Sequence, residues 1–181
     1  LALAKAQPGA LKFGSAGVGS IVQMGSEIVK VGANIDLLHV PYKGGGPATL
    51  ALLSGEIDMT VNDLTTLKAN IDAGKVRALA VANKTRLKPL PDVPTFAELG
   101  FPQIMSSTWW GIAVPVKTPN DIQKKLQSWN DQIIRNPEYV SKLAEMAIDP
   151  IVMTPAEAAA FIAEETVKWR DIADKAKIEL N

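Results

Sequence analysis

A glycine-rich segment with serines at both ends is the part of the sequence best suited to hold an anion. Residues 14–20 read GSAGVGS and lie between a short apolar run and a stretch with helical periodicity. Backbone N–H groups and hydroxyls at that place face the positive end of a helix dipole, where carboxylates and phosphates bind. The glycines also let the backbone approach a ligand closely. The alternative is a tight turn in which Ser20 caps the next helix.

This segment does not have the pattern of a nucleotide-binding loop. Gly17 and Gly19 are followed by Ser20 and two apolar residues, so the G-x-G-x-x-G spacing is missing. The Gly-Lys-Ser/Thr of a P-loop is missing as well. Dinucleotides and nucleoside triphosphates therefore lose support as ligands.

A second loop, PYKGGGP at residues 41–47, repeats the order of strand, glycine-rich loop and helix. Open α/β sheets bind ligands beyond the carboxyl ends of their strands, so the two loops can converge on one ligand. Lys43 either adds positive charge there or is a solvated lysine. Tyr42 either lines the cleft or packs. After the next expected strand, Asp63 is interpreted as a helix cap or a hydrogen-bond acceptor rather than a general base.

Two adjacent tryptophans, Trp109 and Trp110, lie on an expected strand that crosses between two parts of the chain. Alternate residues of a strand face opposite sides, so one ring is expected in the core and the other on the wall of the cleft. Trp110 is the candidate for the cleft wall.

The residue types needed for catalysis or metal binding are scarce. His39 is the single histidine, cysteine is absent, and no G-x-S-x-G elbow occurs. A structural histidine is therefore the favoured interpretation of His39. No zinc constellation can be assembled, and neither a metal nor an organic cofactor is expected. The sequence favours a protein that binds without catalysing a reaction.

Composition narrows the class of protein further. The chain has 181 residues, is 47% hydrophobic, and carries 19 lysines and arginines against 19 aspartates and glutamates. It can bury a substantial core, and no basic tract indicates nucleic acid as a partner. No apolar run approaches the roughly 20 residues of a membrane-spanning helix, so the chain is not expected to be embedded in a membrane. Residues 1–10 resemble the end of a helix that starts upstream, and the chain is expected to begin in mid-domain.

The elements that must position these residues alternate between strands and helices, which predicts an α/β fold with a mostly parallel sheet and flanking helices. Near Ser106 the pattern becomes helix-rich, so we expect an α/β lobe over 1–106 and part of a second, incomplete lobe over 107–181. The expected strands are Leu11–Gly14, Ile35–Pro41, Ile57–Val61, Val76–Ala82, Trp109–Val116 and Pro150–Met153. The expected helices are Ile21–Val31 (closed by Gly32), Pro47–Leu53, Leu64–Ala73, one turn at Thr95–Leu99, Ile122–Ile134, Pro137–Met146 and Pro155–Ala176.

An ordered set of motifs through nearly the whole chain resembles the Bug-type receptors of tripartite tricarboxylate transporters. The motifs are Pro8-Gly9, Leu11–Ser20, His39–Gly44, Pro47-Ala48, Gly55–Met59, Ala73–Val81, Leu90–Thr95, Trp110-Gly111 and Thr118-Pro119. Each is weak alone, but their order is specific. The residues that match the family's binding loop are Ser15, Ala16, Gly17, Gly19 and Ser20.

The resemblance implies a periplasmic-binding-protein-like receptor whose two lobes close on a small carboxylate and which works with membrane permease subunits. It also implies a periplasmic location and another lobe, with a Pro-Gly-Gly loop, that this sequence lacks. Family members often have His where this chain has Gln23. The alternative from another class is the effector domain of a LysR-type regulator, which would need a DNA-binding segment. The ligand itself cannot be named from the sequence.

Overall fold

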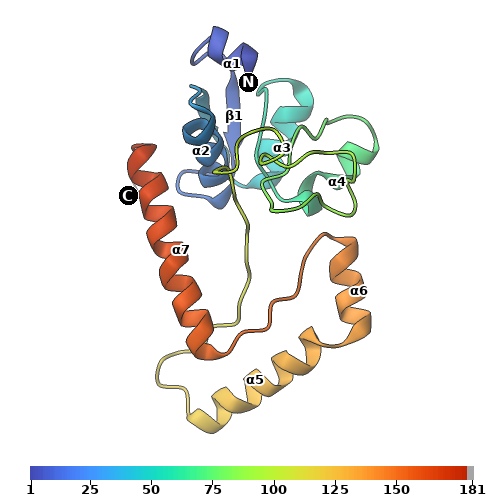
Figure 1. The fold of residues 1–181 in the computed structure, drawn as a ribbon, viewed down its shortest axis with the longest axis vertical. Coiled ribbons are helices and arrows are strands. Elements are labelled where there is room, and N and C mark those ends of the chain that lie inside the picture. Colours follow the sequence, from blue (N-terminus) through green and yellow to red (C-terminus); the bar gives the residue numbers. More distant parts are fainter. Residues whose placement is uncertain (179–181) are drawn as a thin grey trace.

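The computed structural model describes residues 1–178, and its first part is a short parallel sheet flanked by helices (Figure 1). Strands β1 (Lys12–Ser15) and β2 (Leu38–Pro41) are parallel, with Phe13 opposite His39. The helices of this part are α1 (Ala2–Ala6), α2 (Ile21–Ala33), α3 (Gly45–Ser54) and α4 (Leu64–Asp72). Helix α2 crosses over from β1 to β2, as expected for a βαβ unit.

Helix α2 has apolar residues at helical spacing, and all of residues 22–29 are buried, including the polar Gln23, Ser26 and Glu27. It ends two residues later than expected: Asn34, not Gly32, closes it, with a left-handed φ of 49°. The prediction for Gly32 was wrong because that glycine serves packing instead. A Cβ on Gly32 would lie 2.5 Å from Cγ1 of Ile104, so only glycine allows this approach.

The buried hydrophobic residues of the core form two clusters, and Ile35 packs against both. Ile28, Val29 and Ala33 of α2 are buried with Ile104, and Phe13 is buried with Ala4 and Leu37. The first cluster is covered partly by Trp169 and Ile172, which belong to the last helix of the chain. Helix α2 and the last helix, which lie far apart in the sequence, therefore share one cluster.

Two expected strands are present only as isolated bridges. In the segment 57–61, Met59 bridges to Phe13, while the backbone of 58 and 59 donates to the carbonyl of Lys12. In the segment 76–82, Val81 bridges to Thr95. Both segments are extended, but each pairs at one point, so neither extends the sheet. Helix α3 starts at Gly45, two residues before the expected proline.

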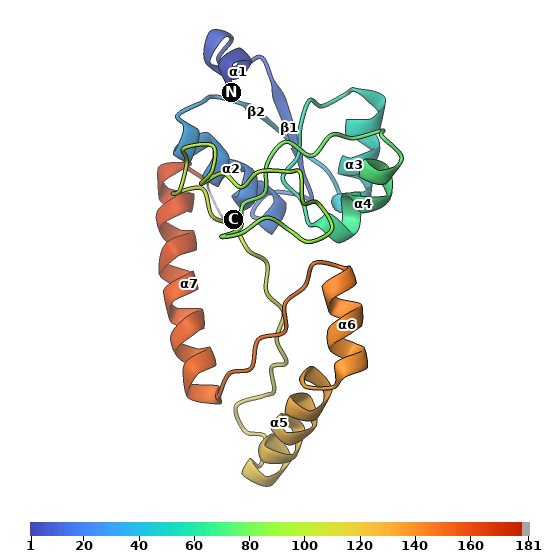
Figure 2. The same cartoon turned by 45° about the vertical axis from the view of Figure 1, so that its right-hand side comes forward.

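After Ser106 the chain leaves the body and returns along a long helix (Figure 2). Helices α5 (Asn120–Ile134) and α6 (Pro137–Glu145) lie away from the body, and α7 (Pro155–Lys175) runs back to pack on α2. The strands expected at Trp109–Val116 and Pro150–Met153 are wrong for this chain. Within residues 1–178 no neighbouring strand reaches these segments, so their backbone has nothing to form a ladder with.

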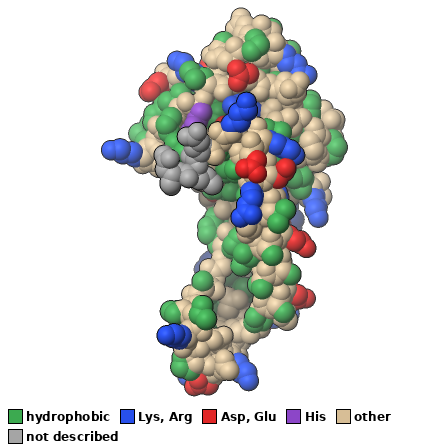
Figure 3. Space-filling view, turned by 90° about the vertical axis from the view of Figure 1, so that its left-hand side faces the viewer, with side chains coloured by type: hydrophobic (Ala, Val, Ile, Leu, Met, Phe, Trp, Pro, Cys, Tyr) green, Lys and Arg blue, Asp and Glu red, His purple; other side chains and the backbone are tan. Residues whose placement is uncertain are grey.

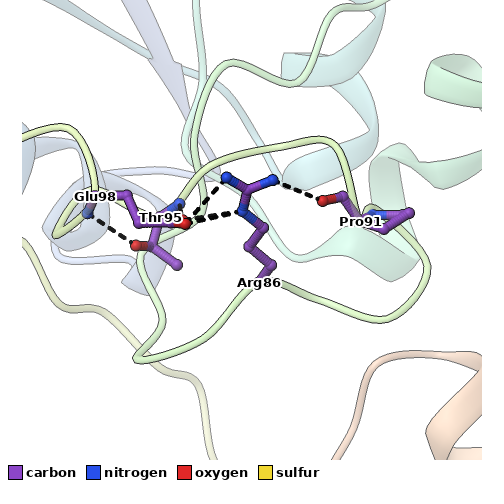
Figure 4. A network of polar contacts seen from close by, with 4 residues as sticks. All are labelled: Arg86, Pro91, Thr95 and Glu98. Atoms are coloured by element: carbon purple, nitrogen blue, oxygen red, sulfur yellow. Dashed lines mark hydrogen bonds and ion pairs between the residues drawn. The ribbon is translucent and has the colours of Figure 1, made fainter.

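A polar network fixes the proline-rich loop at residues 88–94 (Figure 4). The Arg86 guanidinium donates to both carboxylate oxygens of Glu98, at 3.0 and 3.1 Å, and to the carbonyl of Pro91 at 3.0 Å. Glu98 also accepts from the backbone N–H of Thr95 at 2.7 Å, while Thr95 caps the N–H of Glu98. The expected helical turn at Thr95–Leu99 is present as hydrogen-bonded turns, and Gly100 follows it at a φ of 86°.

The segment that leaves the body, together with α5, α6 and the first turns of α7, exposes many apolar side chains. Hydrophobic side chains lie along this narrow part of the molecule in Figure 3. Val116 is 99% exposed, Ile112 74% and Trp129 50%. Because α7 also packs on α2, the last helix contacts the first lobe as well, which the boundary at Ser106 did not anticipate. Among residues 1–178, no helix is long and apolar enough to cross a membrane.

Candidate functional site

The glycine-rich segment forms a loop between β1 and the start of α2, as the sequence predicted. Gly17 and Gly19 have φ values of 129° and 74°, a region that side chains other than glycine adopt only under strain. Ser20 is the N-cap of α2, and its Oγ accepts from the N–H of Gln23 at 3.3 Å. The glycines are therefore required by the backbone conformation of the loop itself.

Not every amide of this loop is free to bind a ligand. The N–H of Gly17 donates to Ser15 Oγ at 3.2 Å, and the N–H of Gly19 donates to Gln23 Oε1 at 2.8 Å. The N–H groups of Ala16 and Val18 have no acceptor within the described part of the chain. These two amides, with the first turn of α2, are the donors that the loop can offer to an anion.

Gln23 is a site residue whose role the sequence analysis missed. Its side chain is buried and holds the loop from the helix, while Ser20 caps the helix from the loop. The signal was present in the sequence, since Ser-x-x-Gln is the spacing of a capping box. Here the glutamine bonds to the residue before the N-cap.

Ser15 is fully buried beneath the loop and does not face solvent. Its Oγ lies 2.6 Å from Nε2 of His39 and 3.1 Å from the carbonyl oxygen of Gly17. The imidazole stacks on Phe13, with ring centroids 4.8 Å apart. Burial, with a smaller effect from the Lys30 ammonium, holds the pKa of His39 below its usual value. The structure thus gives His39 the partners expected of a structural histidine and places Ser15 behind the loop.

The second glycine-rich loop lies directly beside the first. The N–H of Gly44 donates to the carbonyl of Ala16 at 3.2 Å, and the N–H of Tyr42 donates to that of Ser15 at 3.0 Å. The N-termini of α2 and α3 therefore open at the same edge of the sheet, as the order of strands and loops predicted. Lys43 of this loop is exposed to solvent.

The Tyr42 side chain turns away from this edge. Its ring lies beside Gly14, and its hydroxyl donates to Glu56, beyond the far end of α3, at 2.8 Å. Partial burial raises the pKa of Tyr42, and the Glu56 carboxylate adds to the effect. The contacts of Tyr42 with Gly14 and Glu56 support the packing role over a place in the cleft wall.

Polar side chains at residues 62 and 63 complete the edge. Asp63 is at the N-cap position of α4, but its side chain does not cap the helix; it accepts from Thr108 Oγ1 at 3.0 Å. The side-chain nitrogen of Asn62 is buried without a hydrogen-bond partner in the described residues. It lies 3.5 Å from the position that a Cβ would take on Gly45, at the N-terminus of α3. Among the described residues, Asn62 thus offers an unpaired hydrogen-bond donor at this edge of the sheet. The sequence analysis did not single out this residue.

The expectation that one tryptophan would lie in the core is wrong for the described residues, since both rings are exposed, Trp109 at 39%. Trp109 packs edge to face on Phe161 of α7, with ring centroids 5.6 Å apart. Trp110 is 66% exposed on the segment that leaves the body. Within residues 1–178, no group of three or more histidines, cysteines, aspartates or glutamates could hold a metal ion.

Solved structures with this architecture define the class of protein. R. palustris Rpa4515 with adipate superposes with a TM-score of 0.90 at 28% identity, over 98% of this chain and 59% of that one. The periplasmic binding protein BugD gives 0.86 at 25%, and MatC from Rhodopseudomonas palustris with bound malate gives 0.84 at 26%. The chain has the fold of a periplasmic binding protein, an α/β lobe with flanking helices, as the sequence predicted.

The family follows from the sequence comparisons. The model of the tripartite tricarboxylate transporter family receptor matches residues 1–178, and the chain belongs to that family. A Pseudomonas sp. (strain P51) relative encoded between tcbD and tcbE is 35% identical over the whole chain, and Bordetella pertussis BugT is 30% identical over 95% of it. The chain spans about half the length of these relatives, 54% and 53%. The resemblance to Bug-type receptors is confirmed.

Proposed function

We propose that the chain is the larger part of an extracytoplasmic solute receptor that binds a small organic carboxylate and catalyses nothing. The observation that carries the proposal is the edge where two glycine-rich loops and the N-termini of α2 and α3 lie side by side. The amides of Ala16 and Val18 and the side-chain nitrogen of Asn62 are donors there without an acceptor among residues 1–178. Donors at helix N-termini suit a carboxylate.

The relatives support this choice over a regulator. Two of the similar structures hold dicarboxylates, adipate and malate. The effector domain of a LysR-type regulator has a similar plan, but the matching family model is that of a transporter receptor and BugD is a periplasmic binding protein. The proposed location is the periplasm, and the proposed partners are the membrane permease subunits of a tripartite tricarboxylate-type transporter.

The proposal also assigns a role to each part of the chain. Residues 1–106 form the lobe that carries the loops, and 107–181 form the crossing segment and part of a second lobe. Gly17, Gly19 and Ser20 shape the binding loop, with Ser15 behind it, while Lys43, Asp63 and Trp110 lie on segments that border the cleft. Tyr42 supports the second loop from below.

Calorimetry tests the proposal in this chain and in the longest native chain that contains it. Adipate and malate are the probes, and the neutral diamide of adipate is the control with matched shape. We expect heat and saturation with the acids and none with the diamide, because the donors at this edge favour negative charge. Equal binding of acid and diamide, or no binding of either acid by the longer chain, would refute a carboxylate site.

A further inference from the structure

We propose that His39 is a positioning residue for the carboxylate-binding loop and acts through the Ser15 hydroxyl, so that protonation of the imidazole strengthens anion binding. The inference rests on the proposed function, since it concerns how the same loop is held. It assigns a role to a side chain that the carboxylate site does not otherwise use.

The geometry places Ser15 between the histidine and the loop. Its single hydroxyl hydrogen can point to one of two acceptors, His39 Nε2 at 2.6 Å or the carbonyl oxygen of Gly17 at 3.1 Å. Ser15 Oγ also accepts a hydrogen bond from the N–H of Gly17 at 3.2 Å. A change of hydrogen position on Ser15 therefore alters a bond to the central glycine of the loop.

The protonation state of His39 decides which acceptor Ser15 uses. When Nε2 carries no hydrogen, Ser15 donates to it and the Gly17 carbonyl loses this donor. When the imidazole is protonated, Nε2–H donates to Ser15 Oγ, and the hydroxyl turns to the Gly17 carbonyl. The Gly17 carbonyl, which already accepts from the N–H of Ser20 at 3.2 Å, then gains the Ser15 hydroxyl as a second donor. This added bond holds the loop in the conformation that presents the amides of Ala16 and Val18 to an anion.

The surroundings keep the imidazole in place but leave it able to titrate. On the sheet, its ring lies on Phe13, which is fully buried, and β1 contributes no charged side chain to that contact. On α2, Lys30 lies 5.6 Å from the centre of the Phe13 ring and pairs with the buried Glu27 at 3.2 Å. Burial and the Lys30 charge oppose protonation, which keeps the pKa of His39 low in the free protein. A bound carboxylate has the opposite effect and is expected to raise it.

Nitrogen NMR of the imidazole tests the hydrogen-bond pattern without any ligand. His39 is the single histidine of the chain, so the ring signals need no residue assignment, and their couplings to the two carbon-bound ring hydrogens distinguish Nδ1 from Nε2. We expect the neutral ring to carry its hydrogen on Nδ1, with Nε2 as the acceptor, and Ser15→Ala to shift the neutral population toward Nε2–H. A neutral ring that already carries its hydrogen on Nε2 would overturn the inference.

Affinity for adipate as a function of pH tests the consequence for binding. Between about pH 7.5 and about pH 5.5, we expect the dissociation constant of the unaltered protein for adipate to fall by about threefold relative to that of His39→Gln. His39→Gln lacks the titrating group, so comparison with it cancels the effect of the titration of adipate itself. Ser15→Ala should lose the same pH dependence although its His39 still titrates. This second variant separates the hydroxyl from a simple long-range charge effect.

The outcomes separate the two levels of the argument. Binding with the same pH profile in all three proteins, or a profile that survives in Ser15→Ala, overturns the role of His39 and leaves the carboxylate site standing. Failure of the unaltered protein to bind adipate or malate at any pH overturns the proposed function and this inference together.

Discussion

At the scale of single residues, the two glycines with positive φ are the sharpest test of the site. We expect Gly17→Val or Gly19→Val to weaken adipate binding at least about tenfold, which corresponds to about 1.4 kcal/mol. A β-branched side chain disfavours the φ values of 129° and 74° and keeps the backbone from approaching a ligand. Calorimetry gives the dissociation constants.

Gly74→Val is the matched control for this pair. Gly74 also has a left-handed φ, 66°, and a Cβ there would meet nothing within 4 Å, so the variant carries backbone strain far from the loop. It should lose stability and keep its affinity. If all three variants bind alike, the glycine-rich segment is a turn and not the binding loop.

The sequence predicted the place of the site more fully than its contacts. Strand, glycine-rich loop and helix occur in an order that local spacing reveals, so residues 14–20 and 41–47 could be placed. The direction of Ser15 could not, because it depends on His39, which is 24 residues away in the sequence. Asn62 and Tyr42 likewise acquire their surroundings from α3, and no local pattern encodes that packing.

At the scale of elements, the start of α7 is fixed by a complete capping box. Thr154 Oγ1 accepts from the N–H of Glu157, whose carboxylate accepts from the N–H of Thr154 at 2.8 Å. Thr154→Ala should lower the free energy of unfolding by about 1 kcal/mol, since it leaves helix N–H groups unpaired. Urea denaturation measures the change. Thr166→Ala, in the middle of the same helix, is the control and should be neutral or slightly stabilising.

The hydrogen-bond network of the proline-rich loop should make the free energy of unfolding depend on pH through Glu98. Hydrogen bonds from Arg86, and then from the Thr95 backbone, lower the pKa of Glu98 to about 2 in the folded protein from an ordinary 4.5. A depressed folded pKa stabilises the protein above pH 4.5, and the contribution is lost as the pH falls toward 2. In urea melts, Glu98→Gln should therefore be less stable than the unaltered protein near neutral pH, with the difference closing in acid.

Glu138→Gln is the comparison for that measurement. Glu138 pairs with Lys142 at 2.8 Å on the exposed surface of α6, a kind of pair that contributes little to stability. A difference between Glu98→Gln and the unaltered protein that stays constant from neutral to acid pH would contradict the role given to the Arg86 network.

Helices were predicted closely, but of the six expected strands only Leu11–Gly14 and Ile35–Pro41 form within residues 1–178, as β1 and β2, for a physical reason. The pattern that defines α2, α5 or α7 lies within the helix itself, as do its caps, so their bounds came within about three residues. A strand needs a partner. Residues 109–116 have the composition of a strand, but they pair with nothing within residues 1–178, and composition alone could not show this.

At the scale of the whole molecule, the exposed apolar side chains beyond Ser106 should make this chain associate. A groove of about 520 Å³ at α5 and α6 is lined partly by Trp129, Ile133 and Tyr139, and Val116 is almost fully exposed nearby in the sequence. Apolar patches of this kind mark an interface. Sedimentation should show concentration-dependent association, which Val116→Ser combined with Ile112→Ser reduces.

Leu50→Ser is the control for that experiment. Leu50 is 67% exposed, but it lies on α3 in the body of the first lobe. Its replacement should leave association unchanged. A chain that stays monomeric at high concentration and binds no apolar dye would contradict an interface on the residues beyond Ser106.

The extended segment between the body and α5 also has a consequence for hydrogen exchange. The backbone amides of residues 109–114 donate to no acceptor within the described part of the chain, while those of Ile28 and Val29 lie inside a buried helix. Deuterium should enter the first group within seconds and the second only through cooperative opening of the body. If a partner or a further stretch of polypeptide pairs with 109–114, protection will appear there first. The exchange rate at those six amides is thus a direct measure of whether this segment is paired.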